Sequence, residues 1–498
     1  MTGVDLARFE QLQTHLRGVW PTMTLQSVGS VERTVVVLHS FSLDIPDVLA
    51  PVAQAYEERF LVMVLAILRG RRTKVIYVTS NPVLPSVVDY WFRLMPRLDR
   101  PEAHTRLRML SPVDPSFRPL TAKVLERPRF VERIRREIPD PDHAVIYPFN
   151  SSPLEVELAI RLGVPLYGSA PHLWELGAKS TTRRLFREEG IPCPVGREDL
   201  RDVDDLRRAI EELRAECPDL REVIVKHDQG VSGLGNATIK LTGDGDVDRA
   251  IGQLELEDDT IDVDQFLEGL TAGGVVEERV RGDDFRSPSV QMQASPDGEL
   301  EILSTHDQVL GGPHGMSFLG SRFPADPEYA AEITRLGARM GQRLAAEGVI
   351  GRFAADFVVV RDTGGAWRPY AIEINLRCGG TTHTYMALQA LTDGAYDAEG
   401  AQLVAGGRRK YYVSSDHLEA PEYATLTPED FLEIVGDRRI GWDGELLTGL
   451  VYHMVSAIAV AGRVGATAIG DSPLEADQLL RRARRVLDQE TGRSPSGD

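Results

Sequence analysis

Four short β-rich runs separated by helical patterns occupy the first third of the chain, and this alternation restricts its fold more than any other feature. The runs TVVVLHS, KVIYVTS, TRLRML and AVIYPF lie between about Thr34 and Tyr167, and each is bounded by Pro, Ser, Asn or Asp. Between the first two runs, apolar residues that include Phe60 and Val64 recur at roughly helical spacing. SPLEVELAIRLGVP predicts a helix that begins near Pro153 and ends at Gly163. Alternating strands and helices predict an α/β layer with a parallel sheet.

The length of 498 residues is too great for one compact core, so we expect about two to four domains. The pattern of predicted elements changes near Gly177, where helices, strands and glycine-rich stretches are mixed, and it changes again after Lys410. We therefore expect an α/β and α+β multidomain protein. Its parts are an N-terminal α/β domain over residues 1–170, a two-lobed unit over 171–405 that divides near residue 275, and a small α+β domain over 406–498.

Charge and composition exclude several classes of function. The net charge of −19 argues against a nucleic-acid partner, which would require a basic face. Cys193, Cys217 and Cys378 have no pairing pattern, which indicates a reducing cytosol. The N-terminus has no apolar core typical of a signal peptide, and the most apolar run is about half the length of a membrane span. We expect a cytoplasmic protein with no membrane partner.

The segment FAADFVVVRDTGGAWRPYAIEINLR predicts a β-hairpin that carries candidate functional residues. A two-residue turn at Gly364-Gly365 pairs Thr363 with Ala366 and places Asp356 directly opposite Glu373. Directly opposed residues have Cβ atoms roughly 4.5–5.5 Å apart, and like charges there destabilise the sheet unless a cation lies between them.

Residues Glu373, Asn375 and Arg377 share one face of the second strand. Carboxylate and amide oxygens are the hard ligands that Mg²⁺ prefers. The hairpin therefore indicates a magnesium site formed by Asp356, Glu373 and Asn375. The alternative is an ordinary solvated face of an edge hairpin.

The segment VIVKHDQGVSGLGNATIKL places Lys226 at the end of an apolar strand, ahead of a glycine-rich loop and a second strand. The loop contains Gly230, Ser232, Gly233 and Gly235, whose backbone amides can approach phosphate oxygens closely. Neither a Rossmann fingerprint nor a P-loop is present, because a strand follows where a helix or GK[ST] is required. This leaves a hairpin flap over phosphates, or simply a turn.

The order of these features resembles the ATP-grasp superfamily over roughly residues 120 to 400. Lys179 precedes a helix ending in GIPCP, Lys226 precedes the glycine flap, VVEERVRGDDF follows, and Asp356 comes with EINLR. STHDQVLGGPHGMSFLGSRFP, NLRCGGTTHTYM and GLVYHMVSAIAVAGRVGATAIG more narrowly resemble the pheganomycin-type peptide ligase family. The resemblance implies a Rossmann-like pre-ATP-grasp domain, a two-lobed ATP-grasp domain and a small C-terminal domain.

The resemblance also implies cofactors and roles. ATP would bind between the lobes together with two Mg²⁺ ions, or Mn²⁺ in their place. Glu277 and the Val280 backbone would face the adenine edge, Asp284 the ribose hydroxyls, Lys179 and Lys226 the α- and β-phosphates, and Asp356, Glu373 and Asn375 the metal ions. Arg377 would face the γ-phosphate or an oxyanion, with His306 and Arg352 as further substrate-side candidates.

Each of these residues has an ordinary structural alternative. Lys179 can begin a helix at the surface, Glu277 and Asp284 can be solvated acids, and His306 and Gln308 can be loop residues. Arg281, Arg322, Arg352 and His383 are weaker candidates of the same kind. The sequence also departs from many ATP-grasp ligases, because no Lys lies between Lys240 and Lys410. An arginine or His306 would therefore have to meet the γ-phosphate.

The function implied by this resemblance is an ATP-dependent ligase that joins a carboxylate to an amine through an acyl-phosphate. The substrates would be amino acids or peptides, and the enzyme is a possible homodimer. Three alternatives stay open: an ATP-grasp enzyme with a thiol or no acceptor, a non-catalytic ATP-binding scaffold, and a carbohydrate- or peptide-binding module.

Overall fold

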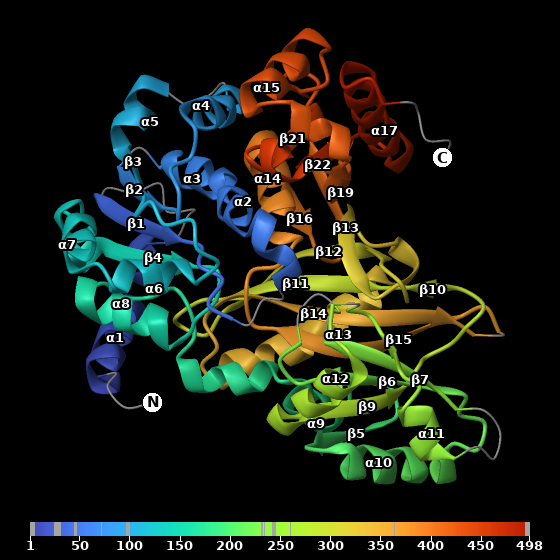
Figure 1. Cartoon of the computed structure of the whole chain (residues 1–498). Coiled ribbons are helices and arrows are strands. Elements are labelled where there is room, and N and C mark those ends of the chain that lie inside the picture. Colours follow the sequence, from blue (N-terminus) through green and yellow to red (C-terminus); the bar gives the residue numbers. More distant parts are fainter. Residues whose placement is uncertain are drawn as a thin grey trace.

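A computed structural model describes residues 5–23, 31–43, 47–70, 72–95, 100–230, 233, 235–241, 246–258, 260–362 and 364–493 (Figure 1). The C-terminal SPSGD, residues 494–498, for which the sequence predicts disorder, lies outside these residues. No helix within the described ranges combines the length and the apolar character that a membrane crossing requires.

The N-terminal part is a parallel α/β layer, as predicted. Its four-stranded sheet has the order β3-β2-β1-β4, and the Val-rich strand β1 is buried along its whole length. The chain order reverses between β1 and β4, which makes this the switch point of the sheet. The strands are β1 (Arg33–Leu38), β2 (Thr73–Val78), β3 (Leu107–Leu110) and β4 (Ala144–Pro148). The helices are α1 (Leu6–Met23), α2 (Ala53–Glu58), α3 (Leu61–Leu68), α4 (Pro85–Leu94), α5 (Arg100–Arg106), α6 (Leu120–Leu125), α7 (Pro128–Arg136) and α8 (Pro153–Leu162).

The next part, which we call lobe A, is a five-stranded antiparallel sheet of order β5-β9-β6-β7-β8. Because β9 lies in the middle of this sheet, lobe A reaches Glu278, a few residues beyond the expected division near residue 275. The strands are β5 (Gly196–Leu200), β6 (Glu222–His227), β7 (Asn236–Lys240), β8 (Glu255–Leu256) and β9 (Gly274–Glu278). The helices are α9 (Lys179–Glu188), α10 (Val203–Glu216), α11 (Val247–Ile251) and α12 (Val263–Gly269).

The remaining chain builds a ten-stranded sheet of order β10-β14-β11-β12-β13-β19-β22-β21-β20, with β15 paired to β14. We call its part up to residue 405 lobe B. Its strands are β10 (Phe285–Arg286), β11 (Pro288–Ala294), β12 (Leu300–Gly311), β13 (Ser317–Phe323), β14 (Gly351–Arg361), β15 (Trp367–Asn375), β19 (Tyr411–Glu419), β20 (Trp442–Asp443), β21 (Thr448–His453) and β22 (Arg463–Gly470). A small sheet contains β16 (Ala395–Asp397), β17 (Gln402–Ala405) and β18 (Arg408–Arg409). The helices are α13 (Pro327–Ala346), α14 (Thr382–Thr392), α15 (Pro428–Asp437), α16 (Ala457–Ala461) and α17 (Pro473–Glu490).

The C-terminal segment continues the sheet of lobe B. Strand β19 pairs with β13, with Gly320 opposite Ser415 and Phe323 opposite Tyr412. The division expected at residue 406 therefore separates segments of chain that share one sheet. One hydrophobic core also joins this segment to the N-terminal layer, and α3 and α14 pack against each other there (Figure 1).

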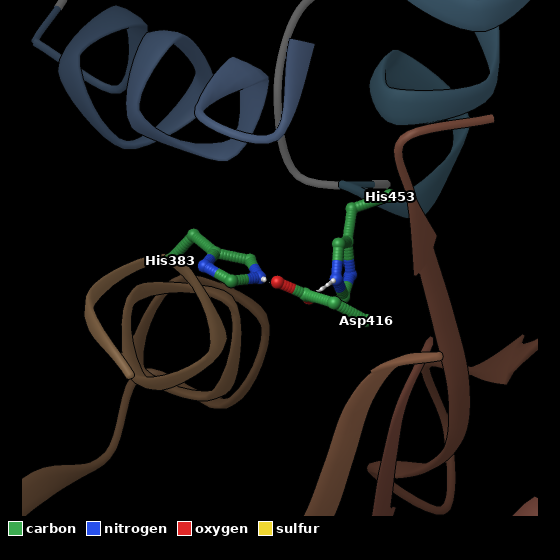
Figure 2. Close-up of side chains that lie close together, drawn as sticks. All are labelled: His383, Asp416 and His453. Carbon is green, nitrogen blue, oxygen red and sulfur yellow. Dashed lines mark hydrogen bonds and ion pairs between the residues drawn. The ribbon is translucent and has the colours of Figure 1, made fainter. Parts of the chain in front are cut away.

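A buried ion-pair cluster lies where the N-terminal layer, α14 and the C-terminal strands meet (Figure 2). Asp416 accepts a hydrogen bond from Arg59 at 2.7 Å, lies 2.7 Å from His453 Nε2 and lies 3.8 Å from His383 Nε2. Burial alone would raise the pKa of Asp416, but Arg59 and His453 hold it well below its usual range. The three potential ligand atoms lie within 4.8 Å of one another, as a metal would require. Because Arg59 already neutralises the carboxylate, we interpret the cluster as an ion pair that joins the three segments.

Candidate functional site

A cavity of about 250 Å³ lies between lobe A and lobe B. Both lobes contribute the side chains that the sequence singles out. The lining includes Lys179, Lys226, Gly230, Gly233, Glu277 and Val280, and also Asp356, Glu373, Asn375, Arg377 and Gln308. The structure therefore brings the glycine flap, the two lysines and the acidic hairpin together around one space.

The hairpin β14–β15 places Asp356 directly opposite Glu373, which confirms the predicted pairing. The path to this register differs from the prediction. The backbone N–H of Asp362 donates to the Ala366 carbonyl at 2.9 Å, so the turn is one residue longer than expected, and Thr363 lies outside the described residues. A bulge beside Asp356 shifts the register back by one. The two irregularities cancel at the acidic pair.

The acidic pair lies within a short hydrogen-bond network. The Asn375 amide donates to Asp356 Oδ2 and to Glu373 Oε1, both at 3.0 Å. The Ser289 hydroxyl donates to Asp356 Oδ1 at 2.6 Å. Burial and the charge of Glu373 raise the pKa of Asp356 to about 6. These two carboxylates repel each other in the absence of a cation.

Lys179 is the nearest cation to this pair, with its Nζ 3.4 Å from Glu373 Oε2. Burial would raise the pKa of Glu373, but Lys179, the Asn375 amide, Lys226 and Arg377 together lower it. Glu373 is therefore ionised at neutral pH.

The donor set fits a divalent metal ion. Two opposed carboxylates, one of them with a raised pKa, present hard oxygens to the cavity. Asn375 now donates its NH₂ to both carboxylates, and a rotation of this amide would present its oxygen instead.

Lys179 is fixed between lobe A and lobe B. It is the first residue of α9, and its Nζ also donates to the Gly230 carbonyl at 2.9 Å. Asp228 holds the start of α9, because its Oδ1 accepts from the backbone N–H and the hydroxyl of Ser180, both at 2.8 Å. The lysine thus connects the flap to the acidic pair.

Lys226 has a different partner. Its Nζ pairs with Glu277, and Arg183 donates to the other oxygen of the same carboxylate at 2.7 Å. All three side chains are buried in the wall of lobe A. The negative charge of Glu277 is therefore balanced by Lys226 and Arg183.

The glycine flap contacts the loop between β12 and β13 of lobe B. Gly233 has a φ of 83°, and a Cβ there would lie 2.4 Å from the Met316 carbonyl oxygen, so the position requires glycine. Gly230 lines the cavity, whereas Gly235 lies behind it, close to the Gly230 Cα. Ser232 lies outside the described residues.

Glu257 of lobe A holds the loop between β12 and β13. Its carboxylate accepts from the backbone N–H of His314 at 3.1 Å, from that of Met316 at 3.2 Å and from the Ser317 hydroxyl at 2.7 Å. The loop is short, because β12 runs to Gly311 and β13 begins at Ser317. Flap and loop together close one side of the cavity.

Two predicted site residues lie elsewhere. His306 is buried outside the cavity lining, with its Nε2 2.5 Å from the Tyr412 hydroxyl, because the rings of Phe323, Tyr385 and Tyr412 pack around it. Burial lowers its pKa to about 3. Asp284 pairs with Arg286 and also lies outside the lining. The substrate-side position expected for His306 is corrected by this placement.

Arg352 lies in a second, smaller cavity that it shares with Arg377. Arg377 lines both cavities. The weaker candidates Arg281 and Arg322 pair with Glu222 and Asp477, and neither lines the larger cavity.

Ser289, Asn236 and Phe318 also line the cavity, and sequence reasoning did not select them. A signal existed for Ser289. Strand β11 contains Ser289 and Gln291 at alternate positions between apolar residues, which indicates one polar face. For Asn236 and Phe318 the sequence offers no comparable pattern.

Comparisons with known proteins find ATP-grasp relatives of this chain. A family model described as IQCH-like, ATP-grasp matches residues 262–399. The chain is 31% identical over 439 residues to an L-propargylglycine–L-glutamate ligase from Streptantibioticus cattleyicolor, which covers 86% of this chain and 88% of the relative. It is 23% identical over 430 residues to the IQ motif-containing protein H of Danio rerio, covering 75% of this chain and 40% of that protein.

Solved structures share the fold at low sequence identity. An ADP complex of N5-carboxyaminoimidazole ribonucleotide synthetase has a TM-score of 0.51 at 14% identity, covering 92% of this chain and 97% of that one. The biotin carboxylase domain of the Hydrogenobacter thermophilus 2-oxoglutarate carboxylase, in complex with MgADP, ADP and bicarbonate, has a TM-score of 0.53 at 13% identity, covering 91% and 90%.

Proposed function

Because this chain belongs to the ATP-grasp ligase family that contains the L-propargylglycine–L-glutamate ligase, it is an ATP-dependent ligase that forms C–N bonds, and we propose that it joins the carboxylate of one amino acid or peptide to the amine of another. The reaction passes through an acyl-phosphate. Two amino acids appear in the relative's name, and for this chain we propose only that the substrates are amino acids or peptides.

One observation supports this proposal above the others. Asp356 and Glu373 converge across one hairpin, with Lys179 3.4 Å from Glu373 and Arg377 on the same cavity wall. A divalent cation and the terminal phosphates of a nucleotide are the ligands that such a set of charges fits.

The nucleotide would lie between the lobes. Glu277 and the Val280 backbone would face the adenine edge, and Lys179 and Lys226 the α- and β-phosphates. The amides of the flap, from Gly230 to Gly235 and including Ser232, would cover the phosphates. Asp284 would reach the ribose hydroxyls after leaving Arg286.

Asp356, Glu373 and Asn375 would hold Mg²⁺, in our proposal two ions. When bound, these ions neutralise the charge of the terminal phosphates and align them for transfer.

The first chemical step activates the carboxylate. Its oxygen attacks the γ-phosphorus of ATP, the bond to the β-phosphate oxygen breaks, and ADP leaves. Arg377 donates hydrogen bonds to the transferred phosphoryl group, because it lies beside the acidic pair and no lysine is available in lobe B.

The second step forms the amide. The amine attacks the acyl carbonyl, Arg377 stabilises the oxyanion, and inorganic phosphate leaves. Acyl-phosphates hydrolyse, so the closed contact between Gly233, Met316 and Glu257 excludes water during this step.

We also propose a cytoplasmic location and a homodimer. Cys193, Cys217 and Cys378 are free thiols in the structure, as in a reducing compartment. Light scattering of the purified chain tests the dimer.

The test is ADP release over a panel of amino acids and short peptides as donors and acceptors, with amide detected by mass spectrometry. The proposal requires amide in amounts equal to ADP. Acyl transfer to a thiol, or ADP release with no acceptor incorporated, would contradict it in favour of a thiol ligase or a carboxylate kinase. A scaffold would release no ADP.

A further inference from the structure

The loop between the acidic hairpin and α14 forms one side of the larger cavity. Strand β15 ends at Asn375, and α14 begins at Thr382. The residues of this loop that line the cavity are Arg377, Gly379, Gly380 and Thr381. Glycine gives the backbone wide conformational freedom, so two successive glycines do not fix the course of the loop. Its position therefore depends on how the start of α14 is held.

A chain of buried hydrogen bonds ends on this loop. Thr384 Oγ1 donates to the Thr381 carbonyl at 2.9 Å and lies 2.9 Å from the Tyr412 hydroxyl. The Tyr412 hydroxyl in turn lies 2.5 Å from His306 Nε2. The side chains of Thr384, Tyr412 and His306 belong to residues that are at most 2% exposed. The chain thus runs from lobe B through the C-terminal segment to the wall of the cavity.

The group at the end of the chain fixes the direction of every hydrogen bond in it. A carbonyl only accepts, so the single hydroxyl proton of Thr384 points to Thr381. The Tyr412 hydroxyl must therefore donate to Thr384, and the Nε2–H of His306 must donate to Tyr412. Burial lowers the pKa of His306 to about 3, so the ring is neutral. Its Nδ1, which has no hydrogen-bond partner among the described residues, is the nitrogen without a proton.

The first turn of α14 has further contacts of the same kind. His383, next to Thr384, points toward Asp416 of β19, with its Nε2 3.8 Å from the carboxylate (Figure 2). Thr382 connects the turn to the loop, because its Oγ1 accepts from the Gly379 N–H at 2.9 Å. Strand β19, which also carries Tyr412, therefore contacts two successive residues of this turn.

We propose that His306, Tyr412 and Thr384 are positioning residues for the loop before α14. By holding this loop, they keep Arg377 in the geometry that phosphoryl transfer requires. None of the three lines the larger cavity, so His306 acts through Tyr412, and Tyr412 acts through Thr384. The C-terminal segment, which supplies Tyr412, thereby takes part in the reaction. This inference rests on the proposed function and adds to it the residues that hold its phosphate-binding arginine in place.

The test uses three variants of the chain and one control. Thr384→Val keeps the shape of the side chain and removes the hydroxyl, whereas Thr384→Ser keeps the hydroxyl. Tyr412→Phe breaks the chain one step further from the cavity. Thr467→Val is the matched control. Thr467 is a buried threonine of the neighbouring strand β22, and its hydroxyl has no hydrogen-bond partner within the described part of the protein.

The first measurement is hydrogen exchange followed by mass spectrometry, which needs no substrate. In Thr384→Val the amides of residues 376–385 exchange about 10-fold faster or more, because the first turn of α14 is released. Tyr412→Phe has a smaller effect, since Thr384 still donates to Thr381. Thr384→Ser and Thr467→Val match the wild type in this segment. Peptides from lobe A keep their wild-type rates in every variant, which separates local release from a general loss of stability.

The second measurement is turnover with hydroxylamine as acceptor, since hydroxylamine traps an acyl-phosphate as a hydroxamate. The donors are the amino acids and short peptides of the panel given above. The kcat falls about 10- to 100-fold in Thr384→Val, as expected when a group at the reacting centre is displaced, and about 2- to 10-fold in Tyr412→Phe. The KM for ATP stays unchanged, because the lost interaction is made in the transition state.

Two further variants complete the kinetic comparison. The double variant of Thr384→Val with Tyr412→Phe is no slower than Thr384→Val alone, because both changes break the same chain. Thr384→Ser recovers most of the wild-type kcat, and Thr467→Val keeps all of it.

Two results would overturn the inference and leave the proposed function intact: an exchange rate of residues 376–385 that Thr384→Val does not change, or faster exchange with an unchanged kcat. A wild type that forms no hydroxamate from any donor would contradict the proposed function, and with it the reaction that these residues serve. If Thr384→Val does not fold, Tyr412→Phe decides, because wild-type exchange and kcat in that variant also count against the inference.

Discussion

The two lobes that enclose the cavity hold carboxylates in opposite electrostatic settings. In lobe A, Glu277 lies between Lys226 and Arg183 and is neutralised. In lobe B, Asp356 faces Glu373, and burial together with the charge of Glu373 raises the pKa of Asp356 to about 6. A carboxylate beside the cavity is therefore not by itself evidence of a metal site. A carboxylate that is paired with cationic side chains stabilises the fold. Two opposed carboxylates with too few cationic side chains around them can instead bind a metal cation.

Removing the neutralised carboxylate gives the largest expected effect. Glu277→Ala leaves Lys226 and Arg183 buried without their anion, so the free energy of unfolding falls by about 3–5 kcal/mol. Denaturant titration measures this. Glu212→Ala, which breaks an exposed pair with Arg197 in the same lobe, is the control and costs less than about 1 kcal/mol. An equal loss of unfolding free energy in both variants would contradict the stabilising role of the Glu277 ion pairs.

The opposed carboxylate in lobe B has the reverse effect. Asp356→Asn removes like-charge repulsion and a metal ligand. Because burial and Glu373 raise the pKa of Asp356, its charge is unfavourable in the folded state, so stability stays the same or rises while kcat for ADP release falls at least about 100-fold. Asp362→Asn, at the exposed turn of the same hairpin, is the control for both measurements. If Asp356→Asn unfolds as easily as Glu277→Ala, or turns over normally, the two electrostatic settings are not different in kind.

The Ser289 hydroxyl tests the metal-binding role of Asp356 separately. It donates a hydrogen bond to Asp356 at 2.6 Å and does not contact the nucleotide in our proposal. Ser289→Ala raises the Mg²⁺ concentration at half-maximal activity by about 10-fold, as expected for loss of a group that orients a metal ligand. Ser295→Ala, in the turn that follows the same strand, leaves it unchanged. An unaltered Mg²⁺ response in Ser289→Ala would show that Asp356 does not bind the metal.

The smallest effect concerns the contact between the lobes. Glu257→Gln weakens the acceptor for the loop at Met316, so water reaches the acyl-phosphate more often. The ratio of ADP to amide rises roughly two- to five-fold, the value of one neutral hydrogen bond. The exposed Glu268→Gln on α12 keeps the wild-type ratio. A ratio that stays at one in Glu257→Gln would exclude this role.

Sequence reasoning succeeded where contacts are local. The opposition of Asp356 and Glu373 follows from one hairpin, and it survived a wrong turn length only because a bulge compensates. The four parallel strands and the helices between them follow from periodicity and from Pro and Gly signals.

Non-local packing was out of reach. His306 was expected at the substrate from the family resemblance, yet Tyr412, which packs against it, is 106 residues away. The pairing of β13 with β19 likewise joins segments that the sequence separates.

The central claim is that this chain activates a carboxylate as an acyl-phosphate. The most direct measurement uses a donor labelled with ¹⁸O in its reacting carboxylate, followed by mass spectrometry of the released phosphate. Our account predicts one labelled oxygen in inorganic phosphate and none in ADP. Label in AMP, or label that stays entirely in the donor and the amide, would contradict it.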